Sequence, residues 1–308
     1  MIGMYLRLVA SMALWGATWV SGRIVAQVLH PFSAAFLRFF FAGVFLYFLS
    51  CRTERHWPVF PRAAVWGVVF LGVSGVFSYN YFFFSGLSYI QAGRAALIVA
   101  CVPSVVALYS AVVLRQPVTA LKVLGIALSL SGVAVILSGG DLMSMFTHGV
   151  GVGDLFILGC VVAWSAYSLA GAKVMRASTP LSAVTWSCII GDVLLLFPAL
   201  NSGLVVEATA ATPVIWAHLV FLGVGATGLA FTWYYAGILA LGAPRASIFI
   251  NLVPVFATLL SCTLMGEAVG ASLVLGGGMV VTGVVLANRQ GGEVPPRPQN
   301  SAVRKPAS

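Results

Sequence analysis

The sequence alternates long apolar runs with short polar segments. A helix that crosses a bilayer core of about 30 Å needs roughly 20 residues, and ten runs approach this length. Backbone groups in lipid must be hydrogen-bonded within the chain, so each run is predicted to be an α-helix. The predicted spans are 4–28, 33–50, 63–85, 92–114, 119–138, 153–175, 181–199, 214–239, 244–264 and 271–288.

The composition agrees with this pattern and argues against a soluble globular protein. Of the 308 residues, 60% are hydrophobic and 7% are charged, whereas a soluble domain has about 25% charged residues. There is too little polar surface to cover a water-soluble globule. The predicted fold class is therefore all-α, a polytopic membrane protein with ten transmembrane helices.

The distribution of charge orients these helices. The formal net charge is +9, and most lysines and arginines fall in segments that are cytoplasmic if the N-terminus is inside. The opposite segments carry the acidic residues Asp141, Asp154, Glu207 and Glu267. This bias predicts that both termini are cytoplasmic. It also explains the positive charge by topology, without a nucleic-acid partner.

The chain ends and the cysteines suggest no further chemistry. Residues 289–308 are polar, proline-containing and basic, which predicts a disordered cytoplasmic tail. The first apolar run lacks a suitable cleavage sequence and is interpreted as a retained span. The five cysteines are an odd number and include no CxxC pair, so no disulfide framework, metal site or cofactor is expected.

The sequence repeats itself in its two halves. Trp15 and Trp164 are 149 residues apart, and the stretch FLGV at 70–73 recurs at 221–224, an offset of 151. Other rare residues, among them prolines and glycines, recur in the same order at these offsets. The repeat indicates two related units joined by loops of slightly different length.

The two units, 4–138 and 153–288, each contain five predicted spans. Because five is odd, the second unit begins on the opposite side of the membrane, and the repeats are predicted to be inverted. Inverted repeats are typical of transporters whose substrate site lies near the midplane between the halves.

Short motifs in both units are shared with a known family. They are LWGATW at 14–19 and LRF at 37–39 near the start, and AAL at 95–97, VP at 102–103 and GE at 266–267 near the ends. In order and spacing they resemble two tandem EamA domains of the drug/metabolite transporter superfamily, covering about residues 5–288.

This resemblance implies a ten-helix transporter with a central cavity, lined mainly by helices 1, 3, 4, 6, 8 and 9. Members of the family move amino acids and other small metabolites, often outward. One position departs from the family pattern, because the glutamate present as Glu267 is Gln116 in the first unit.

Aromatic residues mark the predicted first and sixth helices. Trp15 and Trp19 lie on one face of the first helix, and Trp164 and Tyr167 lie together on the sixth. Large apolar rings with polar N–H and O–H groups suit the walls of a substrate cavity. Packing between helices, or an interfacial belt of aromatics, is the alternative. The small residues around Gly16 should allow close helix approach.

The third and eighth predicted helices supply further candidates for substrate binding. These are Tyr79, Asn80, Trp233 and Tyr234. A polar group such as Asn80 within a span usually faces protein or water. It could bind a substrate amine or carboxylate, or it could bind a neighbouring helix.

Two prolines occupy equivalent positions in the fourth and ninth helices. Pro103 and Pro254 cannot donate a hydrogen bond, and each ring clashes with the carbonyl four residues earlier, at Val99 and Ile250. Kinks that line the cavity and free these carbonyls for a substrate are the favoured interpretation, with Asn251 beside the second proline. Structural kinks without a ligand are the alternative.

Four charged residues are candidates for coupling or gating. Arg38 and Asp192 lie inside predicted spans, where a charge should be paired or hydrated. Asp192 is the plausible proton carrier, or a structural charge, and depth alone allows it to pair with Arg38. Arg94 and Arg245 begin the fourth and ninth helices, where they could attract carboxylates at the two entrances or snorkel to the interface.

The motif content favours transport over catalysis. No phosphate-binding loop, H-E-x-x-H or G-x-S-x-G motif occurs, so the chain is not expected to be an enzyme. The hypothesis is a transporter of the bacterial cytoplasmic (inner) membrane that exports amino acids, including aromatic ones, by alternating access. The alternatives are an exporter of lipophilic or cationic drugs and a receptor or scaffold without flux. The expected partners are a small-molecule substrate and the lipid bilayer, with the chain acting as a monomer or homodimer.

Overall fold

The computed structural model describes residues 2–54, 64–115, 119–141, 150–174, 179–241 and 249–288, which are helical with short connections. Within these residues, eight helices are long and apolar enough to cross a membrane, which confirms a polytopic helical membrane protein. The ninth and tenth predicted spans coincide with shorter apolar helices, Phe249–Met265 and Ala271–Ala287. A total of ten membrane spans therefore stays a prediction.

The elements follow the predicted spans closely at most boundaries. In the first half they are α1 (Ile2–Ala26), α2 (Pro31–Glu54), α3 (Val65–Leu71), η2 (Gly72–Ser78), α4 (Tyr79–Tyr89), α5 (Ala92–Val99), α6 (Val102–Val112) and α7 (Ala120–Leu137). In the second half they are α9 (Val152–Val174), α10 (Pro180–Asn201), α11 (Leu204–Ala210), α12 (Pro213–Val220), η3 (Phe221–Leu229), α13 (Ala230–Leu241), η4 (Phe249–Asn251), α15 (Leu252–Met265) and α16 (Ala271–Asn288).

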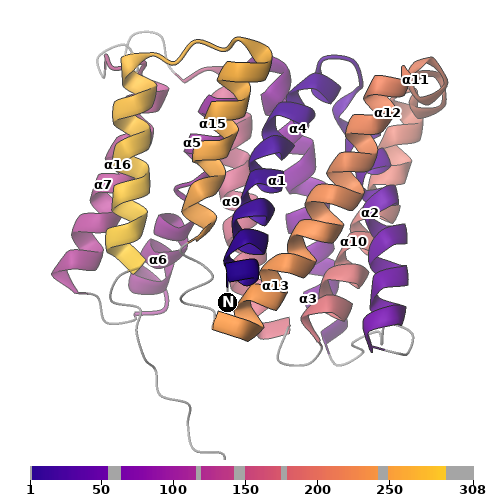
Figure 1. Cartoon of the computed structure of the whole chain (residues 1–308), viewed down its shortest axis with the longest axis horizontal. Helices are drawn as coiled ribbons and strands as arrows, with labels where there is room; N and C mark the ends of the chain where they lie inside the picture. The colour runs from indigo at the N-terminus through magenta and orange to yellow at the C-terminus, as the bar shows by residue number, and fades with distance from the viewer. Residues whose placement is uncertain are drawn as a thin grey trace, which may run out of the picture.

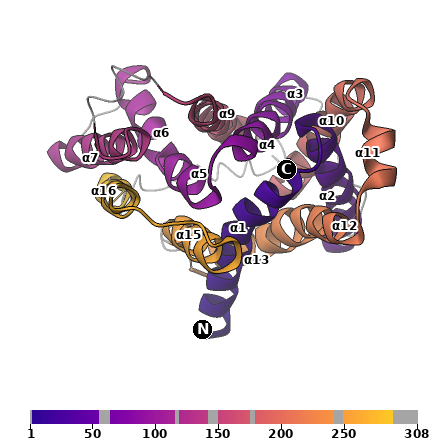
Figure 2. The same ribbon diagram turned by 90° about the horizontal axis from the view of Figure 1, so that it is seen from above.

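The helices run alternately between two ends of the molecule (Figure 1). We call the end where α1 and α15 finish and α2 and α5 begin the upper end, as drawn there, and the opposite end the lower end. Seen end-on, α7 and α16 lie side by side at one edge, and α2, α10 and α12 at the other (Figure 2). Helices α1, α5 and α15 occupy the middle between these two groups.

The third and eighth spans are each interrupted by a π-helical segment, which the apolar pattern did not predict. The segments η2 and η3 occupy corresponding places in the repeat and are rich in glycine. Glycine lets aromatic rings pack where a Cβ would stand, Tyr167 against Gly75 and Phe45 against Gly228. Segments of this kind are rare and frequently occur at functional sites.

The fourth and ninth spans are interrupted near their prolines, but differently from the predicted kinks. Helix α5 ends at Val99, and Pro103 lies in the first turn of the new helix α6. In the same way, the 3-10 segment η4 precedes α15, whose first turn contains Pro254. The first turn of a helix does not need the missing N–H, so each proline starts a helix instead of bending one.

Helices α7 and α16 approach each other closely through glycines. Gly125 faces Gly283, and Gly132 faces Gly276. A Cβ added at Gly132 would lie 2.5 Å from the carbonyl oxygen of Gly276. Small residues thus allow these two helices to pack closely within one chain.

Replacing Gly132 with alanine should destabilise the protein by about 1–3 kcal/mol, because the new methyl group meets backbone that cannot move aside. Thermal unfolding of the purified protein in detergent measures this. The matched control is Gly278→Ala on α16, where an added Cβ would meet nothing within 4 Å. Equal melting temperatures for the two variants would contradict the close contact.

Candidate functional site

A cavity of about 480 Å³ lies in the middle of the helix bundle. Its walls come from α1, α2, α4, α5, α6, α9, η3, α13, η4 and α15, which include every helix that the family resemblance implies. Eight of the predicted substrate-binding residues line it: Trp15, Trp19, Tyr79, Pro103, Trp164, Tyr234, Asn251 and Pro254.

Two tryptophans at equivalent positions of the sequence repeat form parts of the wall. Trp15 donates from Nε1 to the carbonyl of Ala226 in η3 at 2.9 Å, and its ring centroid lies 5.2 Å from that of Tyr234. Trp164 lies 5.1 Å from Tyr79 by the same measure. Each tryptophan is therefore held against the span that contains a π segment, with its ring at the cavity surface.

Three predicted residues lie outside the lining. Tyr167 stacks on Trp164 at 5.0 Å and packs over Gly75 of η2, so it supports the wall from behind. Trp233 and Asn80 are also not among the lining residues. Asn80 is 1% exposed and belongs to the layer behind the cavity.

Asn80 holds a buried arginine. Arg38 on α2 is 9% exposed and lines the cavity. Its Nη1 donates to Oδ1 of Asn80 at 3.0 Å, and Nδ2 of Asn80 donates to the carbonyl of Val76 in η2 at 2.8 Å. Asn80 thus bonds to α2 through Arg38 and to the preceding turn of its own span.

The structure describes two of the three remaining charged candidates, and their environments differ. Asp192 is half-buried in a groove between α2 and α10, away from the central cavity. The described residues contain no ion pair between Asp192 and Arg38. Arg94 forms a bidentate ion pair with Asp154, from Nε to Oδ1 at 2.8 Å and from Nη2 to Oδ2 at 2.9 Å. Arg245 lies outside the described residues.

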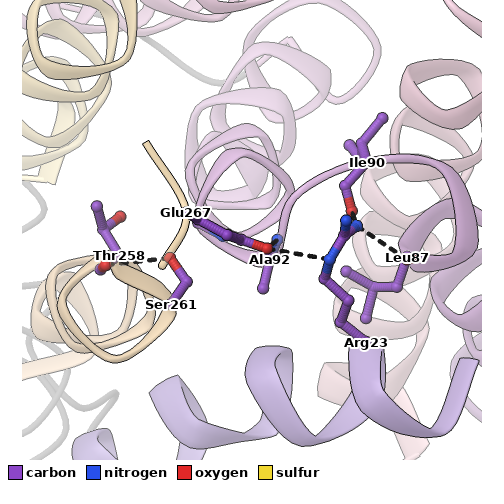
Figure 3. A network of polar contacts seen from close by, with 8 residues as sticks. Arg23, Leu87, Ile90, Ala92, Thr258, Ser261 and Glu267 are labelled. Atoms are coloured by element: carbon purple, nitrogen blue, oxygen red, sulfur yellow. Dashed lines mark hydrogen bonds and ion pairs between the residues drawn. The ribbon is translucent and has the colours of Figure 1, made fainter. Parts of the chain in front are cut away.

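A second ion pair lies at the upper end of the bundle. Nε of Arg23 lies 3.0 Å from Oε1 of Glu267, and the same guanidinium donates to the carbonyls of Leu87 and Ile90 (Figure 3). Glu267 also accepts from the backbone N–H of Ala92 at 3.2 Å, at the start of α5. A carboxylate at a helix N-terminus is favoured by the backbone N–H groups there.

Sequence reasoning missed this network, although a signal for it was present. Arg23, Arg38 and Arg94 are the basic residues that do not fit the cytoplasmic bias of the others. In the structure, two of them pair with carboxylates from the other half of the chain, and the third lines the cavity. These exceptions to the charge bias are the signal by which sequence reasoning could have found the network.

Comparison with protein families shows to which family the chain belongs. The profile of the EamA-like transporter family matches residues 2–138 and matches again at residues 151–289. The chain belongs to the EamA-like transporter family. It is therefore a multi-pass membrane transporter, in agreement with the resemblance of its motifs.

Several individual proteins are similar to this EamA-like transporter. An uncharacterized transporter YyaM of Bacillus subtilis is 28% identical over 93% of this chain and 94% of its own. The aromatic amino acid exporter YddG of Ancylobacter novellus is 29% identical over 73% of this chain and 78% of its own. A probable terminal-alkyne amino-acid exporter of Streptantibioticus cattleyicolor is 30% identical over 75% of each chain.

A solved crystal structure has the same fold. It matches with a TM-score of 0.62 at 24% identity, covering 92% of this chain and 96% of that chain. At this identity the likeness concerns the fold alone.

Removing the amide of Asn80 should destabilise the transporter. In Asn80→Leu, the guanidinium of Arg38 loses its acceptor inside the bundle, so we expect a loss of about 2–3 kcal/mol. Thermal unfolding in detergent is the measurement. Asn201→Leu, at the exposed end of α10, is the control; a loss no larger than that of the control would show that the contact contributes nothing.

Proposed function

We propose that this EamA-like transporter exports amino acids, including aromatic ones, through the central cavity by alternating access. The observation that carries this proposal is the cavity itself: about 480 Å³, walled by Trp15, Trp164 and Tyr79, with Arg38 as the charged residue among its described lining. Cavities of this size hold small molecules. Apolar aromatic walls with few polar groups suit a small zwitterionic molecule better than a polyanion.

The names of two relatives support the same substrate class. YddG of Ancylobacter novellus is named an aromatic amino acid exporter, and the Streptantibioticus cattleyicolor protein a probable terminal-alkyne amino-acid exporter. Both are about 30% identical to this chain. We extend amino-acid export to this protein as a proposal that joins their names to the aromatic cavity.

We propose ten membrane spans arranged as two inverted repeats, 4–138 and 153–288, in the bacterial inner membrane with both termini cytoplasmic. The upper end then faces away from the cytoplasm. The cavity lining extends from Trp19 and Phe83, on the upper side, to Ser168 and Ile250 on the lower side. Substrate would load from the cytoplasm, which is the direction that export requires.

The two ion pairs would form the gate at the upper end. Arg23–Glu267 and Arg94–Asp154 each join the first half of the chain to the second. Release of substrate to the outside would separate the halves there and break both pairs. The two arginines keep part of their side-chain surface exposed, 17% and 24%, so water can hydrate them when the pairs separate.

Two alternatives predict different behaviour. An exporter of lipophilic or cationic drugs would also use aromatic walls, but the positive charge of Arg38 in the lining disfavours a cation. A receptor or scaffold would bind a ligand without flux. We expect no nucleic-acid partner, and we expect the chain to act as a monomer or homodimer.

Transport is tested with labelled L-phenylalanine in proteoliposomes. Wild type should show saturable flux, and Trp164→Ala should raise KM about tenfold, because one aromatic wall of the site is lost. Trp66→Ala, at a tryptophan that is 82% exposed, should leave KM within twofold. Absence of saturable flux of any amino acid, alongside flux of a lipophilic cation, would favour the drug-exporter alternative.

The same assay with and without a pH gradient tests coupling. Because Asp192 lies outside the cavity, we expect the flux of wild type and of Asp192→Asn to be similar and to follow the substrate gradient. Flux that is driven by the pH gradient and lost in Asp192→Asn would establish a proton-coupled carrier instead.

Opening of the proposed gate is tested by thiol labelling. A single cysteine replaces Thr18, a cavity residue, in a background without the five native cysteines, and an impermeant maleimide is added from the outside. Glu267→Gln should raise the labelling rate severalfold, because it removes the charge that pairs with Arg23.

Glu207→Gln is the matched control for this experiment. Glu207 is another carboxylate at the upper end, and it accepts from the backbone N–H of His30. Its replacement should leave the labelling rate unchanged. Equal rates for wild type, Glu267→Gln and Glu207→Gln would contradict the gate.

A further inference from the structure

The guanidinium group of Arg38 is only partly used by the protein. Nη1 donates to Asn80, while Nε is buried and has no hydrogen-bond partner among the described residues. A buried N–H of a charged group without a partner is unfavourable and calls for an explanation, such as an absent ligand. Arg38 also lines the central cavity.

The other two arginines that depart from the charge bias show what the Nε side of a guanidinium group binds. Nε of Arg23 pairs with Oε1 of Glu267, and Nε and Nη2 of Arg94 bind both carboxylate oxygens of Asp154. The Nε–Nη2 edge matches a carboxylate in shape and charge. In Arg38 this edge has no carboxylate partner among the described residues.

The surroundings of Arg38 keep its charge in place without neutralising it. The rings of Phe39 and Phe83 lie 5.3 and 5.5 Å from its Cζ atom. Aromatic faces attract a cation, and Asn80 fixes the direction of one nitrogen. The protein thus orients a positive charge toward the cavity and leaves the opposite charge to be supplied.

We infer that Arg38 is the specificity-determining residue of the central cavity and binds the carboxylate of the transported molecule. The inference rests on the proposed function and makes it more specific, since it requires every good substrate to carry a carboxylate. Because Nε is covered in this structure, binding requires a small rotation of the guanidinium group.

The position of Arg38 also predicts how the substrate lies. Arg38 is in the second turn of α2, on the upper side of the cavity, whereas Trp164 and Tyr234 lie closer to the lower end. The carboxylate would point toward the gate, and the apolar part of the molecule would lie between the aromatic walls. A substrate loaded from the lower end would therefore enter with its carboxylate first.

The test compares three probes that differ in one group each: L-phenylalanine, L-phenylalaninamide without the carboxylate, and 3-phenylpropionate without the ammonium. Their Kd values are measured with the purified full-length protein by tryptophan fluorescence. Wild type should bind both carboxylates about 10- to 100-fold more tightly than the amide, the range for a charge-assisted hydrogen-bonded contact.

The variant Arg38→Gln should lose this preference. Its Kd for both carboxylates should rise at least tenfold, while its Kd for the amide changes less than threefold. Arg38→Lys should restore part of the preference, since it keeps the charge but not the planar edge. Arg7→Gln, at an exposed residue on α1, should behave as wild type.

Several outcomes would overturn the inference. An equal loss for all three probes in Arg38→Gln would show a purely structural role. Equal affinities of wild type for L-phenylalanine and its amide would also overturn the inference. So would a wild-type protein that binds neither carboxylate. Both measurements need only the wild-type protein. Carboxylate preference lost in Arg38→Gln, but without flux of L-phenylalanine, would support the inference and contradict amino-acid transport.

Discussion

The structure depends on one constraint: a polar group inside an apolar helix bundle must find a partner within the protein or bring one from outside. The helices satisfy their own backbone. At the π-helical segments, side chains add hydrogen bonds to backbone carbonyls, as Asn80 does to Val76 and Trp15 does to Ala226. The same residues border the central cavity or support its wall, so the polar pairing that stabilises the bundle also shapes the site.

The constraint is most visible in the few charged residues within the helix bundle. Arg23 and Arg94 are neutralised by Glu267 and Asp154 from the other half of the chain. In the repeat, the positions equivalent to these carboxylates are Gln116 and Tyr5. The duplicated halves therefore carry different chemistry at the two ends, and the ion pairs seen at the upper end have no acidic counterparts in the first half.

The sequence predicted those features that depend on local pattern. Apolar run length located most of the spans, and the repeated tryptophans and prolines located four lining residues, Trp15, Trp164, Pro103 and Pro254. The sequence pattern did not predict features that depend on contacts with residues far along the chain. The π segments depend on rings such as Tyr167 packing over Gly75, and the role of Asn80 depends on Arg38, 42 residues away. Hydrophobic periodicity contains no information about such partners. An arginine that departs from the cytoplasmic charge bias does contain such information, because a charge within a span needs a partner.

The most direct test of the account is to lock the upper end and measure flux. Cysteines replace Arg94 and Asp154, whose side chains meet across the two halves, in a background without the native cysteines. A short bifunctional maleimide then joins them in proteoliposomes. The account predicts that cross-linking abolishes amino-acid flux while ligand binding from the lower end persists, and that a monofunctional maleimide leaves flux largely intact. Undiminished flux through the cross-linked protein would contradict alternating access through the central cavity.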